Sequence, residues 1–304
     1  MTDTRLDDYG FFLARELEHI LPKIFEVEYA DIKYDMVLPI NSEVSRGKDS
    51  YTYRIYDGSG SMRRIGSQAK DLPRADIVRK EVTHKVESYG ASFGYTVQEL
   101  RAAEENPGTQ LEQRRGNVVR RVYEEQMQKL AYFGEPGSGL KGFFNNDQVD
   151  KLVPDKWFDT VGITADEILE LLNESVTRIV DNSNMKEVPD TILLPYSAYR
   201  KISTMKLGTV SDTTVLQFFL KTNEVITDIE PINELTASKS GGFLSKDRMI
   251  TYARNSDKLE MHLPQPLEFF APQLQGLEYT VPAHARHGGV ALYYPKSVMV
   301  TEKA

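Results

Sequence analysis

The segment TQLEQRRGNVVRRVYEEQMQKLAYF, from Thr109 to Phe133, carries the clearest signal of a long helix in the chain. Thr109 and Glu112 have the spacing of a capping box, in which each side chain binds the backbone N–H of the other residue. Gly134 and Pro136 follow the segment, and both residue types are common just after helix ends. At about 1.5 Å per residue, the predicted helix is roughly 37 Å long.

The predicted helix has a narrow apolar stripe and an otherwise polar surface. Apolar side chains recur at close to helical spacing, at Leu111, Val118, Val119, Val122, Met127 and Leu130. Charged and amide side chains occupy the rest of its surface. We therefore expect a helix that lies across a sheet with one face and presents the other face to water or to a neighbouring molecule.

Composition indicates a protein with a sizeable core and no membrane-spanning segment. The 304 residues suffice for one large domain or two of ordinary size. No apolar run approaches the length of a membrane span, and residues 1–12 lack the basic region and apolar core of a secretory signal. The chain has no cysteine, which excludes disulfides and cysteine-ligated metals and gives no reason to place the protein outside a cytoplasm.

The net charge argues against general binding of nucleic acid. The chain has 45 acidic and 37 basic residues, a formal charge of −8, and affinity for phosphate backbones comes from neutralising them. The densest positive charge is the pairs Arg114–Arg115 and Arg120–Arg121. Glu124 and Glu125 follow the second pair by one helical turn, so ion pairs within the helix account for it. A patch that faces nucleic acid is the alternative.

Residues 36–72 predict a long, polar β-hairpin. Met36–Ile40 has the pattern of a short strand, and Ser50–Tyr56 alternates in the manner of a longer one. Asp57–Gly60 is a turn signal, so we expect Ser61–Ile65 to return as the partner strand. An isolated two-stranded ribbon is marginally stable in water, and no nearby segment offers it an apolar face. We therefore expect a neighbouring subunit to support the hairpin.

Residues 73–95 predict another extended segment, in which His84 lies on the face of a sheet and is not a metal ligand. Thr96 and Glu99 form a second capping box, which opens a short helix to about Glu105. Residues 160–259 predict a compact α/β unit whose first helix begins at a third capping box, Thr164 and Glu167. The last 45 residues are rich in predicted strands and are expected to return to the sheet formed by residues 73–95, under the long helix.

No motif for catalysis or cofactor binding is convincing. Gly137, Gly139 and Gly142 have the spacing of a dinucleotide fingerprint, but they follow a predicted helix where that motif follows a strand. His284 and His287 lack a nearby acidic third ligand for a metal. We expect no cofactor, no metal and no enzymatic activity.

The order of these parts resembles tailed-phage major capsid proteins of the Hong Kong 97 type. Short stretches along nearly the whole chain carry the resemblance: Tyr56-Asp57-Gly58, Asp71-Leu72-Pro73, Tyr95-Thr96, Glu99 to Ala103, Gly139 to Gly142 with Asn145, Asp247-Arg248-Met249 with Tyr252, Leu263-Pro264, and Tyr279 to Pro282 with Arg286, Gly288 to Val290 and Pro295. Each stretch is weak alone, and their collinear order is the specific feature.

The resemblance implies an α+β capsid fold in five parts. These are an N-terminal arm (1–35), an extended hairpin loop (36–72), a peripheral domain with a spine helix (73–145), an axial α/β domain (146–259) and a β-rich return (260–304). It implies self-assembly into pentamers and hexamers of an icosahedral shell around double-stranded DNA, with a portal and with scaffolding or cement proteins as partners. The expected location is the virion, after assembly in the host cytoplasm. The lysine–asparagine cross-link of some relatives is not carried over, although Lys48 lies near the hairpin start.

Two kinds of alternative stay open: an encapsulin-like bacterial compartment shell, and a cytoplasmic α+β enzyme that uses His284, His287 or the loop from Gly137 to Gly142. Residues 1–35 fit either a helix on its own domain, which the pattern slightly favours, or an arm on a neighbouring subunit. Within the capsid hypothesis we expect the helix arginines to act at subunit contacts more than on DNA. The candidate contacts between subunits are Phe11, Phe12, Tyr51, Tyr53, Arg54, Tyr56, Arg63, Arg64, Arg114, Arg115, Arg120 and Arg121.

Overall fold

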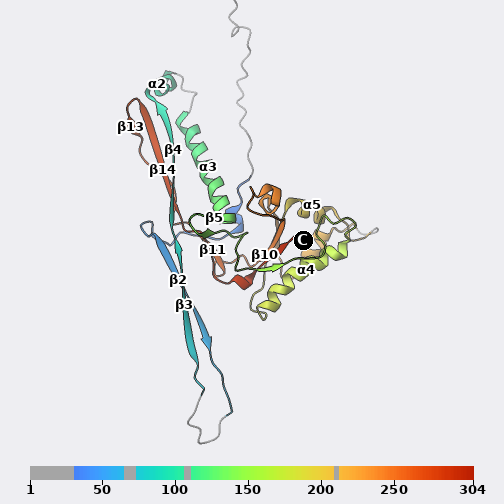
Figure 1. The fold of residues 1–304 in the computed structure, drawn as a ribbon. Coiled ribbons are helices and arrows are strands. Elements are labelled where there is room, and N and C mark those ends of the chain that lie inside the picture. The colour runs from blue at the N-terminus through green and yellow to red at the C-terminus, as the bar shows by residue number, and fades with distance from the viewer. Residues whose placement is uncertain (1–30, 65–72, 106–110, 209–211) are drawn as a thin grey trace, which may run out of the picture. The chain divides into compact units, whose positions relative to one another are not determined.

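The computed structural model describes residues 31–64, 73–105, 111–208 and 212–304, and residues 32–304 form one compact unit (Figure 1). The expectations for residues 1–30, with Phe11 and Phe12, and the capping box at Thr109 lie outside the described residues.

The predicted long helix is confirmed as α3 (Leu111–Phe133). Its buried face consists of Val119, Tyr123, Met127 and Leu130, at the spacing of one helical stripe. The prediction that Val118 and Val122 belong to this stripe is wrong, since these side chains are 53% and 49% exposed. Val118 and Val122 therefore lie on the side of α3 that the rest of the chain leaves exposed.

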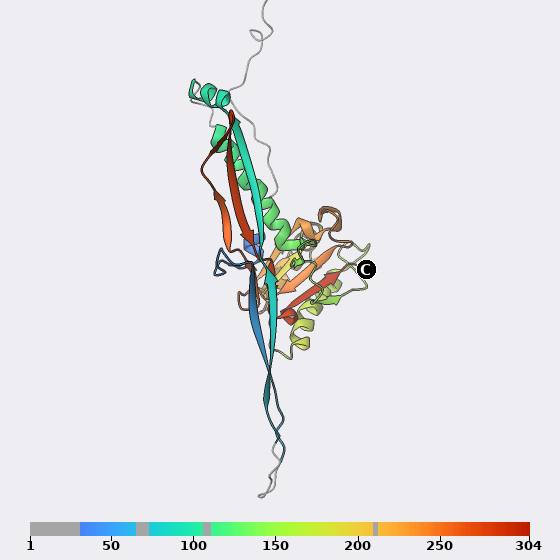
Figure 2. The ribbon, with the colours of Figure 1, turned by 60° about the vertical axis from the view of Figure 1, so that its left-hand side comes forward.

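The sheet beneath α3 is antiparallel and joins two distant parts of the chain. Strand β4 (Glu87–Thr96) pairs along all ten residues with β14 (Glu278–His287), whose other edge pairs with β12 (Gln265–Phe269) and β13 (Gln273–Gln275). Helix α3 lies beside this sheet in both ribbon views (Figures 1 and 2). The expected return of the β-rich tail to residues 73–95 is confirmed for these strands.

The hairpin is real, but its predicted turn and partner strand are wrong. Strand β2 (Ser50–Ser59) continues through Asp57 and Gly58 and pairs with β3 (Asp76–Lys85), with Gly58 opposite Ile77. The turn signal is overridden because β3 offers a full-length partner rich in β-branched residues, and ten paired residues outweigh one local preference. The hairpin strands therefore lie between residues 50 and 85, which shifts the hairpin toward the C-terminus from the predicted range of 36–72.

The hairpin and the sheet under α3 share one extended segment. Val86 separates β3 from β4, is buried, and donates its backbone N–H to Asp49 O at 2.9 Å. On one side of Val86 the segment pairs with β2, and on the other side it pairs with β14. The prediction of a single extended segment over residues 73–95 is thus confirmed for the two strands that follow Ala75. The two halves of this segment belong to different sheets.

A second sheet has five strands in the order β7, β16, β10, β8, β9. These strands are β7 (Asp150–Leu152), β8 (Thr191–Leu194), β9 (Asp228–Pro231), β10 (Arg248–Tyr252) and β16 (Val298–Glu302). Strand β16 pairs with β10 along its whole length. The expectation that the entire tail returns to the sheet under α3 is therefore wrong for its last strand. It is also wrong for β11 (Leu259–His262) and β15 (Val290–Leu292), which pair with each other in a separate three-stranded sheet.

Side chains from the two faces of this five-stranded sheet enter two different cores. Leu193 and Ile250 join the core that contains the end of α3, and Ile192 and Met249 join the other core. Three helices cover that second face: α4 (Ala165–Asn182), α5 (Tyr196–Thr204) and α6 (Val215–Thr222). The predicted capping box of Thr164 and Glu167 opens α4, and an unpredicted one at Thr214 opens α6.

The remaining elements are short. The strand predicted at Met36–Ile40 is wrong, because Met36 and Val37 belong to the helical turn α1 (Tyr34–Val37) and only Ile40 is in a strand. The second capping box is confirmed, since Glu99 accepts from the Thr96 backbone N–H at 2.9 Å, just before α2 (Val97–Glu105). None of the described helices is long and apolar enough to cross a membrane. The other short elements are β1 (Ile40–Asn41), β5 (Gly134–Glu135), β6 (Leu140–Lys141), β11 (Leu259–His262), β15 (Val290–Leu292), η2 (Asn233–Leu235), η3 (Ala237–Lys239) and η4 (Pro295–Ser297).

Substitution of two glycines, one in β2 and one outside it, tests whether β2 is extended through Gly58. A Cβ at Gly58 or at Gly139 would meet no atom within 4 Å, but only Gly139 has a left-handed backbone, with φ of +76°. We expect Gly58→Val to raise amide protection in the hairpin by up to about 1 kcal/mol, because valine favours a strand. Gly139→Val should lower the free energy of unfolding by about 1–3 kcal/mol. Hydrogen exchange and urea unfolding measure both, and a loss of hairpin protection in Gly58→Val would contradict the observed strand pairing.

Candidate functional site

The base of the hairpin packs on the body of its own chain through aromatic rings. The Tyr51 ring centroid lies 5.3 Å from that of His84 on the facing strand and 4.2 Å from that of His262 at the end of β11. The Tyr53 ring meets the Tyr293 ring edge-on, with centroids 4.8 Å apart. The expectation that this chain offers the hairpin no support is therefore wrong for its base.

Polar contacts fix the rings at the base. The Tyr51 hydroxyl donates to Gly288 O at 3.1 Å, and a Cβ added at Gly288 would come within 2.9 Å of the Tyr51 ring. His262 Nε2 and the Tyr293 hydroxyl are 3.0 Å apart, and that hydroxyl donates to Glu260 at 3.1 Å. The absence of a side chain at Gly288 lets Tyr51 lie flat against the body.

A buried arginine holds the segment that leads into the hairpin. Arg286 of β14 donates to the Asp49 carboxylate at 2.6 Å and also to the backbone carbonyl of Arg46. Its side chain is 11% exposed, so this ion pair is shielded from water on the arginine side. Together with the ring contacts, it ties both strands of the hairpin base to β14 and its neighbours.

Burial keeps the histidines around the base neutral. It lowers the pKa of His262 to about 4, with a smaller contribution from the nearby His84. Burial likewise lowers the pKa of His287 to about 4, with His262 contributing. His287 Nδ1 accepts from the Gly289 backbone N–H at 2.8 Å, which holds the ring in one orientation. Desolvation disfavours the charged imidazolium in both residues.

The histidines that the sequence singled out are structural in this geometry. His84 packs between Tyr51 and Tyr53 on the face of the hairpin, as predicted. His287 is fully buried, and His284 lies on the opposite face of β14 from Ala283 and Ala285. Among the described residues there is no group of three or more metal-ligating side chains.

The far part of the hairpin is exposed. Tyr56, Ile77 and Val78 are 61%, 68% and 61% exposed, and Arg63 and Arg64 are exposed beyond the end of β2. Arg54 forms a 3.0 Å ion pair with Glu81 on the facing strand. The candidate contact residues of the hairpin thus separate into Tyr51 and Tyr53, which bind their own chain, and the outer ones, which lie at the surface.

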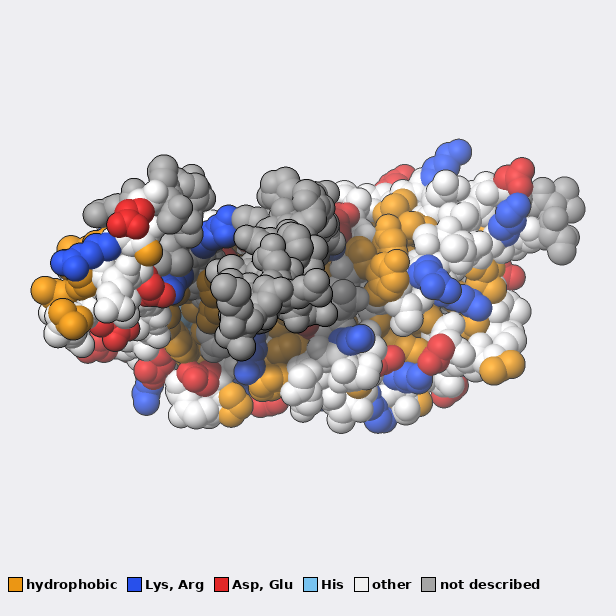
Figure 3. All heavy atoms as spheres, turned by 90° about the horizontal axis from the view of Figure 1, so that it is seen from above, with side chains coloured by type: hydrophobic (Ala, Val, Ile, Leu, Met, Phe, Trp, Pro, Cys, Tyr) orange, Lys and Arg blue, Asp and Glu red, His pale blue; other side chains and the backbone are white. Residues whose placement is uncertain are grey.

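The four helix arginines also divide into two kinds. Arg115 donates to Glu99 at 2.8 Å, which lowers the pKa of that carboxyl to about 2, and Arg121 pairs with Glu125 at 2.9 Å. Arg114 and Arg120 are exposed. On the face drawn in Figure 3, basic and acidic side chains alternate, and no single sign of charge dominates this view.

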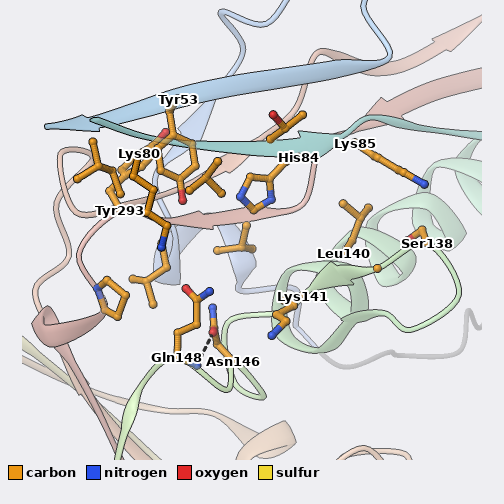
Figure 4. Close-up of a pocket in the computed structure, with 17 residues that line it drawn as sticks. Tyr53, Lys80, His84, Lys85, Ser138, Leu140, Lys141, Asn146, Gln148 and Tyr293 are labelled. Carbon is orange, nitrogen blue, oxygen red and sulfur yellow. Dashed lines mark hydrogen bonds between the residues drawn. The ribbon is translucent and has the colours of Figure 1, made fainter. Parts of the chain in front are cut away.

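A hollow of about 540 Å³ lies between the underside of the hairpin and the body (Figure 4). Hairpin residues such as Tyr53, Lys80 and His84 form one wall, and β6, the following loop and β15 form the other. Sequence patterns did not indicate the residues of the base that come from the tail, His262, Arg286 and Tyr293. Arg286, Gly288 and Gly289 entered the sequence analysis only as parts of the stretches that carry the resemblance.

Comparisons with known proteins point in one direction. A model of the major capsid protein family matches residues 60–302. The capsid of Myoviridae phage XM1 superposes with a TM-score of 0.84 and 17% identity, covering 98% of this chain and 100% of the other. The capsid of a native GTA particle gives 0.64 and 8% identity, with 100% of both chains covered. A virus-like particle from Pyrococcus furiosus gives 0.53 and 15% identity, covering 88% and 91%. A search of curated proteins found no match. At these identities the solved structures show a shared fold.

The Tyr51 contacts predict graded effects of substitution. Tyr51→Phe removes only the hydrogen bond to Gly288 and should cost about 1 kcal/mol of protection at the hairpin base. Tyr51→Ala also removes the ring from between His84 and His262 and should cost about 3–5 kcal/mol. Hydrogen exchange of the β2 and β3 amides measures both. Tyr56→Ala, at an exposed position of the same strand, is the control, and equal losses at both tyrosines would contradict the anchoring role of Tyr51.

The buried histidines predict a fall in stability on acidification. The unfolded chain takes up histidine protons near pH 6.5, whereas folded His262 and His287 do so only near pH 4. Unfolding therefore binds protons between about pH 6.5 and 4, and its free energy decreases as the pH falls through this window. His262→Gln removes one of the two titrations and should make the decrease smaller. Urea unfolding across the window checks this, and equal pH slopes for both proteins would contradict it.

Proposed function

The chain belongs to the major capsid protein family, and from this we propose that its copies close an icosahedral shell around the double-stranded DNA of a tailed bacteriophage. Pentamers and hexamers of the chain build the shell, a portal occupies one vertex, and scaffolding or cement proteins assist. Assembly takes place in the host cytoplasm, and the mature protein resides in the virion.

One observation carries the proposed mode of assembly: the hairpin is anchored at its base and uncovered beyond it. Ile77 and Val78 are 68% and 61% exposed on a two-stranded ribbon, which is marginally stable in water. A second copy that covers this part of the hairpin would bury these side chains and complete the ribbon's support. The structure of one chain thus leaves an apolar surface that a neighbouring subunit can fill.

The parts of the fold take roles that follow from this arrangement. The hairpin of residues 50–85 is the extended loop, and α3 with the sheet of β4, β12, β13 and β14 is the peripheral domain. The five-stranded sheet with α4, α5 and α6 is the axial domain. Tyr56, Arg63, Arg64, Arg114 and Arg120 are exposed contact candidates, while Tyr51, Tyr53, Arg54, Arg115 and Arg121 position the surfaces from within the chain. Phe11 and Phe12 stay candidates on sequence alone.

The shell encloses DNA without sequence-specific binding. The net charge of −8 and the interspersed charges in Figure 3 oppose a firm grip on phosphate backbones. The alternative of an encapsulin-like bacterial compartment shell has less support, because the family whose model matches is that of major capsid proteins. A catalytic role has no support from the geometry of the described residues, whose buried histidines are held by aromatic and backbone contacts.

Shortening the hairpin tests the proposed assembly. Ile55 and Lys80 face each other, so replacing residues 56–79 by Asn-Gly joins them through a two-residue turn. The variant keeps the Tyr51 and Tyr53 contacts at the base, so we expect a folded protein that fails to close shells. Electron microscopy and analytical ultracentrifugation of wild type and variant measure the difference.

The control for this experiment lies in the same molecule. Hydrogen-exchange protection at Tyr51, Val86 and β14 should equal that of wild type, which shows that the body is intact. Closed shells of normal size from the shortened chain would refute the role of the hairpin. A wild-type chain that stays monomeric under all conditions would refute shell formation itself.

A further inference from the structure

The hollow beneath the hairpin has an unusual charge for this protein. Its 17 lining residues include Lys80, Lys85 and Lys141 and no aspartate or glutamate. The chain as a whole has eight more acidic than basic residues. A basic, acid-free hollow in an acidic chain is a local site for a negative group.

Lys80 supplies the unmatched charge of the hollow. It lies on β3 opposite Ile55, on the same face as Val82 and His84, and its side chain extends toward Gln148 and Asn146 (Figure 4). Lys141 already pairs with Asp147 at 2.8 Å, and Lys85 extends away from the centre of the hollow. Lys80 has no ion-pair partner among the residues that the structure describes.

Further polar atoms face the same space. Asn146 is buried and uses its side-chain oxygen to accept from the Gln148 backbone N–H at 3.0 Å, which leaves its amide nitrogen as a donor. His84 Nε2 is buried and has no hydrogen-bond partner. Buried polar groups normally have partners, so the His84 nitrogen is available to a group that enters the hollow.

The rest of the lining is apolar and limits what the occupant can be. Apolar side chains line the hollow together with Lys80, which is itself exposed: Ile55, Val82, Leu292 and the rings of Tyr53 and Tyr293. A DNA backbone needs several cations along an open track, whereas this hollow offers the exposed ammonium of Lys80 beside apolar side chains. A carboxylate side chain on an apolar peptide segment matches both the charge and the lining.

We propose that the hollow receives a segment of a second copy of this chain. An aspartate or glutamate of that segment pairs with the Lys80 ammonium beneath the hairpin of the first copy. The inference rests on the proposed shell and names one of its contacts. A second copy is the occupant for two reasons. Each copy has more acidic than basic residues, and in the proposed shell every hairpin lies next to another copy. The contact holds the hairpin from below, on the side that its own body leaves open.

Zero-length cross-linking tests the contact directly. Shells assembled from equal amounts of ¹⁵N-labelled and unlabelled chain are treated with a carbodiimide, which joins an amine to a carboxylate that already touches it. Mass spectrometry should find Lys80 linked to an aspartate or glutamate of the opposite isotope, and not in unassembled chain. Links between Lys80 and its own chain only, or no Lys80 link where other lysines form intersubunit links, would overturn the proposal. If Lys80 is protected from chemical modification in DNA-filled but not in empty shells, the group in the hollow is a phosphate, and the proposal is overturned as well.

Charge variants provide the second measurement. Lys80→Glu should lower the yield of closed shells on the order of tenfold, because like charges then meet in a partly enclosed site. Lys80→Arg should assemble normally, and Lys246→Glu, at another exposed lysine, is the matched control. Exchange of the cross-linked carboxylate for lysine should restore assembly of Lys80→Glu. Normal yield from Lys80→Glu refutes the contact while shells still form, whereas failure of wild type to form shells refutes the proposed function instead.

Discussion

One uninterrupted extended segment, from Asp76 to Thr96, is the constraint on which the rest of this fold depends. Its first ten residues pair with β2 and its last ten pair with β14. Because a paired strand bends little, the direction of the sheet under α3 sets the direction in which the hairpin leaves the body. The change of partner occurs at Val86, whose burial and hydrogen bond to Asp49 hold the junction.

The contacts at this junction explain how a marginal ribbon can leave the body in a defined direction. Tyr51 lies between His84 and His262, and Arg286 binds Asp49, so four segments far apart in the sequence meet within a few residues. Beyond this anchor, the hairpin has exposed Ile77 and Val78 and an open hollow beneath it. The fold therefore fixes the root of the hairpin through contacts within the chain and leaves its outer part exposed.

The five-stranded sheet differs from the hairpin, because other parts of the same chain cover both of its faces. Strand β16 lies between β7 and β10, so the end of the sequence is built into the middle of the sheet. Alternate residues of β8 and β10 enter different cores, one shared with α3 and the other with α4 and α6. A hydroxyl contact of 2.9 Å between Ser175 and Thr251 satisfies the polar groups buried between helix and sheet. This body provides the fixed support from which the hairpin extends.

The sequence by itself determined those features whose cause lies within a few residues of the effect. The helix Leu111–Phe133, the capping boxes at Thr96 and Thr164, and the strand character of residues 50–56 follow from local spacing and residue type. Only the tertiary structure decided that β2 passes through the Asp57–Gly58 turn signal, that Val118 and Val122 face outward, and that β16 joins the second sheet. Tyr51 and Tyr53 were proposed from the sequence as contacts between subunits, and within one chain their rings contact His262 and Tyr293. The physical reason is that strand pairing and burial depend on segments elsewhere in the chain, and local propensity carries no information about which segment pairs or packs there.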